Sequence, residues 1–344
     1  MIDLENKIRE NIKNLKPYSS ARDEFSGSEG VFLDANENPY GNFNRYPDPH
    51  QSELKEIIAS VKELRPENIF LGNGSDEAID IAYRIFCEPG LDRALIFTPT
   101  YGMYEVAAGI NNILIENIPL DKVFQINLDL VKPLLADKNL KLIFICSPNN
   151  PTGNTISRED IEFILTHFNG IVIIDEAYID FSQAESYILS IKKYNNLIVL
   201  QTFSKAWALA GARIGMAFSN ERIINYFNII KPPYNISSLN QQAVIKKLNE
   251  IEIYQKNLSK ILRAKDFLKK ALEEISFIKR IYPSEANFFL AEVTDANSIY
   301  LKLLNEKIIV RNRTHVIANC LRITIGSSDE NQKLITALKK IEHG

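Results

Sequence analysis

Two cations stand eight residues apart in the segment TFSKAWALAGARIG, residues 202–215, which carries no other charge. The amine of Lys205 can bond covalently to a carbonyl carbon, and the planar guanidinium of Arg213 suits a phosphate group. Two solvated side chains beside a turn would account for the same residues. The role of the pair therefore depends on the polar residues that the rest of the chain places near it.

A carboxylate, Asp175, ends the apolar run GIVIID (170–175), which is followed by EAYIDF. Such a run predicts a buried strand, and an isolated carboxylate at its end is costly to bury, so Asp175 requires a cationic partner. One strand-helix-strand unit separates Asp175 from Lys205. Both side chains can therefore reach the same edge of a parallel sheet, where ligands bind.

Two turn-rich segments also follow predicted strands. Glycines at 72 and 74 permit a tight turn, after which Ser75 and Asp76 present free backbone N–H groups to which a phosphate can bind. An ordinary turn with Ser75 as the helix cap is the alternative. In SPNNPTG (147–153), two prolines and a glycine restrain the backbone and present the amides of Asn149 and Asn150.

One cofactor requires all of these features. Pyridoxal 5′-phosphate needs a lysine for its aldehyde, a carboxylate for its pyridinium nitrogen and a cradle for its phosphate. Lys205 and Asp175 supply the first two, while Arg213 and the hydroxyls of Ser204 and Thr202 supply the third. The sequence therefore indicates a pyridoxal-phosphate site.

These residues need an α/β sheet to position them. Six apolar runs predict buried strands: 68–72, 93–97, 140–146, 170–175, 196–202 and 213–218. Helical patterns lie between them, including 75–88 and 157–169, the second opened by Ser157 as cap with Asp160 in its first turn. The alternation predicts parallel strands covered by helices on both faces. From about residue 237, a long helical stretch followed by NFFLAEV and CLRITIG predicts a second, smaller α+β domain.

Composition narrows the class of protein. The chain has 344 residues, 45% of them hydrophobic, and its 40 basic and 43 acidic residues give a net charge of -3. This balance argues against nucleic-acid binding and favours small ligands. Three widely spaced cysteines predict buried thiols, no disulfide and no metal site. The chain start lacks an apolar signal region and no apolar run is long enough to span a membrane, so we expect a cytoplasmic protein.

The motifs resemble those of one known family. In chain order they are KPYSSAR, LDANENPYG, NRYPDP, GNGSDE, FTPTYGMY, CSPNNPTG, IDEAYIDF, TFSKAWALAGARIG, KPPYNIS and CLRITIGS. This series covers nearly the whole chain and is similar to that of the class I/II, fold-type I pyridoxal-phosphate aminotransferases, within them the branch acting on histidinol phosphate. The resemblance implies an N-terminal arm joined to the small domain (1–30), a large cofactor-binding domain with a mainly parallel seven-stranded sheet (31–240), a small α+β domain (241–344), and a homodimer with active sites at its interface.

The resemblance also implies roles for individual residues. Lys205 is the covalent cofactor lysine, Asp175 pairs with the pyridine nitrogen, Tyr178 and Asn150 bond the cofactor O3′ oxygen, and Tyr101 stacks on the ring. The expected phosphate ligands are Ser75, Asp76, Thr202, Ser204, Arg213 and, from the other subunit, Tyr46. The tyrosines could equally be ordinary core or interface residues.

Substrate binding is expected from a second set of residues. Arg322 is the implied main anionic anchor, and the others are Arg311, Tyr18, Asn36, Asn150 and Tyr234. Arg313, in the loop between the two arginines, can share the phosphate contact.

The implied reaction is a ping-pong amino transfer in histidine biosynthesis, from L-histidinol phosphate to 2-oxoglutarate, giving imidazole-acetol phosphate and glutamate. The freed amine of Lys205 would act as general base. Three alternatives stay open: a threonine-phosphate decarboxylase, a broad-range or aromatic aminotransferase, and a non-catalytic cofactor-binding sensor.

Overall fold

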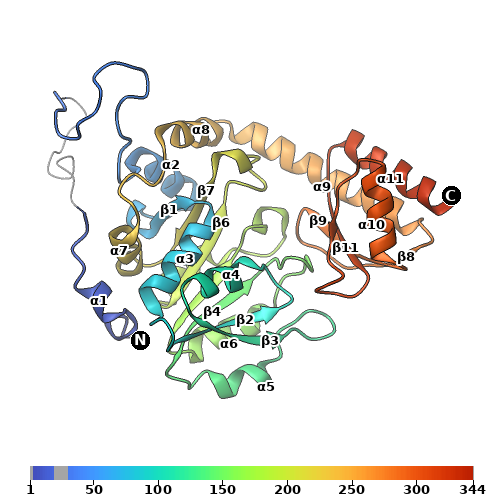
Figure 1. Ribbon diagram of the computed structural model, residues 1–344, viewed down its shortest axis with the longest axis horizontal. Coiled ribbons are helices and arrows are strands. Elements are labelled where there is room, and N and C mark those ends of the chain that lie inside the picture. Colours follow the sequence, from blue (N-terminus) through green and yellow to red (C-terminus); the bar gives the residue numbers. More distant parts are fainter. Residues whose placement is uncertain (1–2, 19–29, 344) are drawn as a thin grey trace.

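Seven strands form the main sheet, in the order β1-β7-β6-β5-β4-β2-β3. The computed structural model describes residues 3–18 and 30–343 (Figure 1). The strands are β1 (Ile69–Asn73), β2 (Arg93–Thr98), β3 (Leu114–Pro119), β4 (Leu140–Cys146), β5 (Ile171–Asp175), β6 (Leu197–Thr202) and β7 (Ile214–Phe218). Neighbours from β3 to β6 pair in parallel, whereas β7 is antiparallel to both β6 and β1. The mainly parallel α/β sheet is thereby confirmed.

The six predicted strands are all present, but two features of the sheet differ from the sequence prediction. Strand β3 was not predicted, because it lies at the sheet edge and its residues are mostly exposed or half-buried instead of forming an apolar run. Strand β7 is not parallel to its neighbours. The segment between β6 and β7, residues 203–213, is shorter than the dozen or more residues that a parallel crossover needs, so the chain reverses there.

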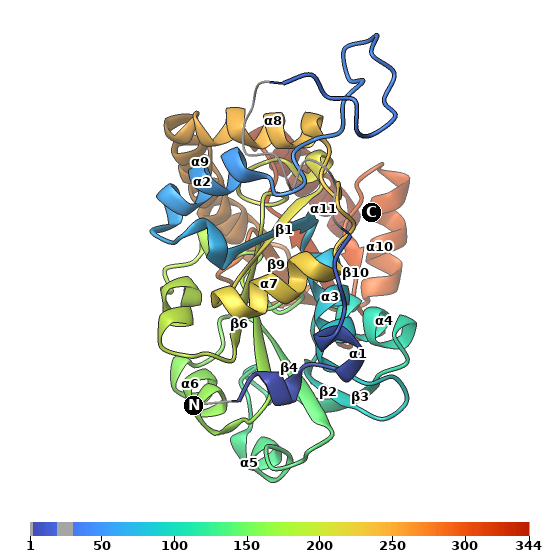
Figure 2. The ribbon, with the colours of Figure 1, turned by 90° about the vertical axis from the view of Figure 1, so that its left-hand side faces the viewer.

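Helices cover both faces of the main sheet (Figure 2). One face packs against α2 (Ser52–Lys62), α6 (Arg158–His167) and α8 (Ser238–Leu248). The other packs against α3 (Ser75–Phe86), α4 (Met103–Ile110) and α7 (Glu221–Ile230), whereas the short α5 (Leu128–Val131) packs with the first group. The predicted cap is confirmed, since Ser157 Oγ accepts a hydrogen bond from the Asp160 backbone N–H at 3.4 Å.

A second, antiparallel sheet has the strand order β10-β11-β9-β8. Its strands are β8 (Ile278–Ile281), β9 (Phe288–Val293), β10 (Arg311–Asn312) and β11 (Cys320–Thr324), with helices α9 (Ile251–Glu273), α10 (Ala296–Asn305) and α11 (Ser328–His343). These elements share their own apolar core, and the long α9 connects it to the main sheet (Figure 1). The α+β unit that the sequence predicted from about residue 237 is therefore present.

The described start of the chain packs on the main sheet. Leu4, Ile8 and Ile12, spaced four apart, are buried among the helices on the α3 face, and the Arg9 N–H donates to the Ile85 carbonyl at 2.9 Å, just before α1 (Glu10–Lys13). The resemblance implied that this segment joins the small domain; its apolar face instead covers the large sheet. Residues 19–22 of the KPYSSAR motif lie outside the described residues.

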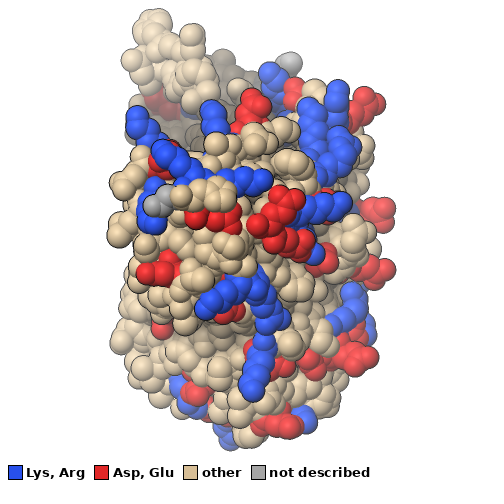
Figure 3. All heavy atoms as spheres, turned by 90° about the vertical axis from the view of Figure 1, so that its right-hand side faces the viewer, with Lys and Arg blue, Asp and Glu red and all other residues tan. Residues whose placement is uncertain are grey.

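Residues 31–46 extend away from both sheets (Figures 1 and 2). Val31, Leu33 and Tyr40 are at least 84% exposed. On the opposite side of the molecule, over the C-terminal helices, Lys and Arg side chains alternate with Asp and Glu without a large patch of one sign (Figure 3). Across the described ranges, no helix is long and apolar enough to cross a membrane. Cys87, Cys146 and Cys320 are buried free thiols.

Candidate active site

A cavity of about 730 Å³ opens where β4, β5 and β6 end and α3 begins, and the β10–β11 hairpin of the small sheet closes its far side. The structure brings together these predicted residues on its walls: Ser75, Asp76, Tyr101, Asn150, Asp175, Tyr178, Thr202, Ser204, Lys205, Arg213, Arg311 and Arg322. They come from the ends of β4, β5 and β6, from the start of α3, from the loops beside these elements and from the second sheet. The sheet edge predicted from sequence is therefore the floor of a large cavity.

Asp175 lies at the buried floor of the cavity, 2% exposed, where β5 pairs with β4 and β6. Its Oδ2 accepts a hydrogen bond from the Tyr104 hydroxyl at 2.7 Å, and its Oδ1 accepts one from the Ala177 N–H at 3.0 Å. Burial raises the pKa of this carboxyl, while these two bonds and the charge of Lys205 oppose that rise. Neutral donors thus hold the carboxylate, and the charge of Lys205 is a further, smaller influence on it.

Lys205 follows β6 on the segment that reverses into β7. Its pKa is lowered, first by burial and then by the positive charge of Arg322. The ammonium nitrogen lies 5.7 Å from the centre of the Tyr178 ring. A lowered pKa increases the share of neutral amine, which is the form that attacks a carbonyl carbon or accepts a proton.

An anion cradle forms at the start of α3. Gly74 caps this helix in the left-handed region, at φ +76°, with no side-chain cap, which leaves the first N–H groups open to a ligand. Arg213 Nη1 donates to Ser204 Oγ at 3.5 Å, and Arg213 Nη2 lies 3.7 Å from Asp76 Oδ2. A Cβ at position 74 would lie 2.6 Å from Arg213 Nη2. The positive φ favours glycine here, and a Cβ would displace the Arg213 guanidinium from the cradle.

Further hydrogen bonds connect the remaining predicted side chains. The Ser204 N–H donates to Thr202 Oγ1 at 3.1 Å, and the Tyr101 hydroxyl donates to Asp76 Oδ1 at 3.1 Å.

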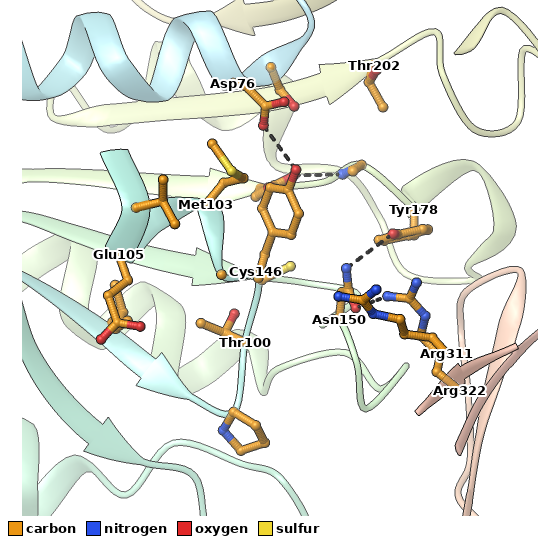
Figure 4. Close-up of a pocket in the computed structure, with 18 of the residues that line it drawn as sticks. Asp76, Thr100, Met103, Glu105, Cys146, Asn150, Tyr178, Thr202, Arg311 and Arg322 are labelled. Atoms are coloured by element: carbon orange, nitrogen blue, oxygen red, sulfur yellow. Dashed lines mark hydrogen bonds between the residues drawn. The ribbon is translucent and has the colours of Figure 1, made fainter. Parts of the chain in front are cut away.

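On the other side of the cavity, Asn150 donates to the Tyr178 hydroxyl at 3.5 Å and accepts a 2.5 Å bond from Arg322 Nη1 (Figure 4). Asn150 therefore joins the wall of the main sheet to the wall of the small sheet.

Three arginines line the wall contributed by the small sheet. Arg311 and Arg322 are register partners in β10 and β11, and both reach toward Asn150 (Figure 4). Burial lowers the pKa of Arg313 and of Arg322, and the neighbouring guanidinium charges lower them further. Arg313 Nε is buried without a hydrogen-bond partner. This concentration of like charge makes the wall a receptor for an anion.

Four predicted residues lie away from the cavity: Tyr18, Asn36, Tyr46 and Tyr234. The rings of Tyr46 and Tyr234 stack on each other with centroids 4.4 Å apart, and Tyr18 is 72% exposed. Asn36 and Tyr46 border a separate hollow of about 390 Å³. A single chain does not bring these side chains to Lys205.

Several residues in or directly behind the cavity were not predicted from the sequence. Tyr104 bonds Asp175 directly, and Thr100, Cys146 and His315 line the walls. Tyr104 belongs to the motif FTPTYGMY, and the need of a buried carboxylate for donors was the available signal. No comparable signal marked His315. Within residues 3–18 and 30–343, no group of three or more His, Cys, Asp or Glu side chains is arranged to hold a metal ion.

Comparison with known proteins identifies the family. A family model described as aminotransferase class I and II matches residues 28–338. The chain belongs to this family. The aminotransferase is 50% identical to the histidinol-phosphate aminotransferase of Bacteroides thetaiotaomicron, with 99% of this chain and 100% of that protein covered.

Solved structures of aminotransferases share the fold. The histidinol-phosphate aminotransferase of Clostridium acetobutylicum superposes with a TM-score of 0.81 at 27% identity, covering 88% of this chain and 92% of that one. The histidinol-phosphate aminotransferase of Sinorhizobium meliloti, solved in complex with pyridoxal-5′-phosphate, gives 0.79 at 22% identity, with 90% of each chain covered. The fold-type I α/β architecture is thereby confirmed.

Proposed function

We propose that this aminotransferase transfers an amino group from L-histidinol phosphate to 2-oxoglutarate, with pyridoxal 5′-phosphate as cofactor, in histidine biosynthesis. One observation carries the proposal: the same cavity joins the Lys205–Asp175 pair to a wall of three arginines. The 50% identity to a histidinol-phosphate aminotransferase over nearly the full chain supports it.

The residues of the cavity fit this cofactor. The open N-terminus of α3 with Arg213 and Ser204 suits its phosphate, Asp175 suits its ring nitrogen, and Asn150 with Tyr178 suits its O3′ oxygen. When bound, the cofactor withdraws electrons from the carbon that carries the amino group, which makes the hydrogen on that carbon acidic. The chain must then supply the group that moves this proton.

Lys205 is that group. Burial and Arg322 favour the neutral form of its amine. A neutral amine can accept the proton from the substrate carbon that carries the amino group, and the protonated amine can then give that proton back. With the cofactor bound, Asp175 would keep its ring nitrogen protonated, because the carboxylate is buried and kept in place by two donors. Asn150 and Tyr178 orient the ring for this transfer.

The arginine wall is assigned to the substrate anion. Histidinol phosphate carries no carboxylate, so its phosphate is the anion that Arg322 can hold through two parallel hydrogen bonds, assisted by Arg311 and Arg313. Glutamate and 2-oxoglutarate present carboxylates to the same guanidinium groups in the other half of the reaction. A wall with three cations suits both anions.

Product analysis tests the proposal against its alternatives. Purified protein supplied with the cofactor would be given 2-oxoglutarate with histidinol phosphate, phenylalanine or tyrosine, and separately threonine phosphate alone. We expect glutamate to form fastest with histidinol phosphate. Release of carbon dioxide from threonine phosphate would identify a decarboxylase instead, and equal rates with the aromatic amino acids would identify a broad-range enzyme. Cofactor binding without any product would identify a sensor.

We further propose that the enzyme is a cytoplasmic homodimer, with a large domain at 31–240 and a small domain at 241–344. The exposed apolar residues Val31, Leu33 and Tyr40 would be covered by a second copy, which would bring Tyr46 to the neighbouring cofactor phosphate.

Mixed dimers test this assembly. Tyr46→Ala and Lys205→Ala chains, each inactive alone, should regain part of the activity when mixed, because one hybrid site would hold both intact residues. Mixed dimers that form but stay inactive would show that Tyr46 does not act across the interface.

A further inference from the structure

Tyr104, on α4 outside the predicted site, donates its hydroxyl to Asp175 Oδ2 at 2.7 Å. Both residues are almost completely buried, Tyr104 at 0% and Asp175 at 2% exposure. The other carboxylate oxygen accepts the Ala177 N–H at 3.0 Å. Each oxygen of the carboxylate therefore has one fixed protein donor, while Asp175 still lines the cavity.

The ring of Tyr104 is held from several sides. It stacks on Phe144 with centroids 4.9 Å apart and meets the edge of Tyr101 at 5.6 Å. Its carbonyl accepts the hydroxyl of Tyr83 at 2.9 Å. Packing of this kind fixes the ring, so that the hydroxyl points toward Asp175, with the Cys146 thiol also beside it. Burial also raises the pKa of Tyr104, so it remains a donor across the working pH range.

The surroundings of Asp175 have opposing effects on its ionisation. Burial and the nearby carboxylate of Asp76 disfavour its ionised form, whereas Lys205 and the Tyr104 hydroxyl favour it. Since Lys205 is committed to the cofactor and the substrate, the Tyr104 bond is a constant support that does not change during the reaction.

We propose that Tyr104 is a positioning residue that keeps the Asp175 carboxylate charged and aimed at the ring nitrogen of the cofactor. The inference rests on the proposed cofactor. Tyr104 does not touch the reacting atoms; its effect on the ring nitrogen passes through Asp175. The ring nitrogen is the only cofactor atom whose interaction should respond to its loss.

A cofactor analogue with CH in place of the ring nitrogen isolates this contact. Cofactor-free protein would be titrated with pyridoxal phosphate or the analogue, with binding followed by quenching of the sole tryptophan, Trp207, two residues from Lys205. Loss of a hydrogen bond to a buried charge predicts that Tyr104→Phe weakens binding of pyridoxal phosphate about tenfold, or ~1.4 kcal/mol. Binding of the analogue should change less than about twofold.

Two further variants serve as controls. Tyr83→Phe also deletes one buried tyrosine hydroxyl, but that hydroxyl bonds the Tyr104 carbonyl and not Asp175, so the ratio of the two affinities should stay as in wild type. In an Asp175→Asn background, Tyr104→Phe should cost no further pyridoxal-phosphate affinity, because the charge that it supports is gone.

The outcomes separate the inference from the proposed function. A wild-type protein that binds neither ligand would overturn the proposed function itself. A wild type that prefers pyridoxal phosphate to the analogue, with the preference intact in Tyr104→Phe, would overturn only the role of Tyr104. If Tyr104→Phe weakens the binding of both ligands equally, or if Tyr83→Phe shows the same loss of affinity, Tyr104 has only a packing role. A wild type that binds both ligands equally would show that Asp175 does not meet the ring nitrogen.

Discussion

The two walls of the cavity are built on different principles. On the main-sheet wall, the polar groups of Asp175, Tyr104 and Asn150 are buried and paired with fixed partners. On the small-sheet wall, Arg313 and Arg322 are only partly buried and repel each other, and Arg313 Nε has no partner. These groups of the first wall are held by protein partners, whereas the second wall gathers like charge.

This difference has a physical meaning for the enzyme. A preorganised wall costs no rearrangement when charge develops on the reacting atoms, which suits the side that holds the cofactor permanently. A wall of repelling cations gains most when an anion arrives, which suits the side that must exchange two substrates in each cycle. The Arg322–Asn150 hydrogen bond at 2.5 Å is a direct link between them.

The largest expected effect comes from the main-sheet wall. Lys205→Ala should lower kcat by about a thousandfold or more, because the amine both holds the cofactor and moves the proton. The exposed Lys122→Ala is the matched control and should keep wild-type activity. Borohydride treatment followed by peptide mapping should place the cofactor on Lys205; a label on another lysine would move the active centre elsewhere.

An intermediate effect is expected from the small-sheet wall. Arg322→Ala should lower kcat/KM for histidinol phosphate about ten- to a hundredfold, from the loss of a charge-assisted hydrogen bond worth about 1.5–3 kcal/mol. Histidinol, which lacks the phosphate, should lose much less.

Alanine variants of Arg311 and Arg313, assayed with both substrates, locate the phosphate more finely. A selective loss only in Arg313→Ala would shift the phosphate contact to the loop between β10 and β11. Equal losses for the two substrates in Arg322→Ala would mean that this arginine supports the fold or the cofactor.

The smallest expected effect tests the electrostatic link between the walls. Burial lowers the pKa of Lys205 most, and the positive charge of Arg322 lowers it further. Arg322→Ala should therefore raise the pKa of Lys205, so that its neutral, reactive amine appears at higher pH than in wild type. Arg322→Lys keeps the positive charge and should leave the pKa of Lys205 nearly unchanged.

The rate at which an amine-directed reagent labels Lys205 in the cofactor-free protein, followed against pH, gives this pKa directly. Identical curves for wild type and Arg322→Ala would show that the two walls do not interact through charge.

The sequence by itself determined the features that depend on local pattern. Apolar runs marked six of the seven strands of the main sheet, Ser157 marked the start of α6, and the residues at the strand ends marked Lys205, Asp175 and the anion cradle. Each of these follows from neighbours within a few residues, or from the rule that parallel strands end at a common edge. The chemistry of the main-sheet wall could therefore be predicted before its geometry was known.

Only the tertiary structure decided which distant residues meet. The Tyr104–Asp175 bond joins residues 71 positions apart, and the Arg322–Asn150 bond joins residues 172 apart. The tertiary structure also decided the antiparallel direction of β7 and the presence of the edge strand β3. It likewise decided that Arg313 Nε is unpaired and that Leu4, Ile8 and Ile12 pack on the large sheet. Such contacts depend on strand register and on how two sheets pack, which local periodicity does not encode.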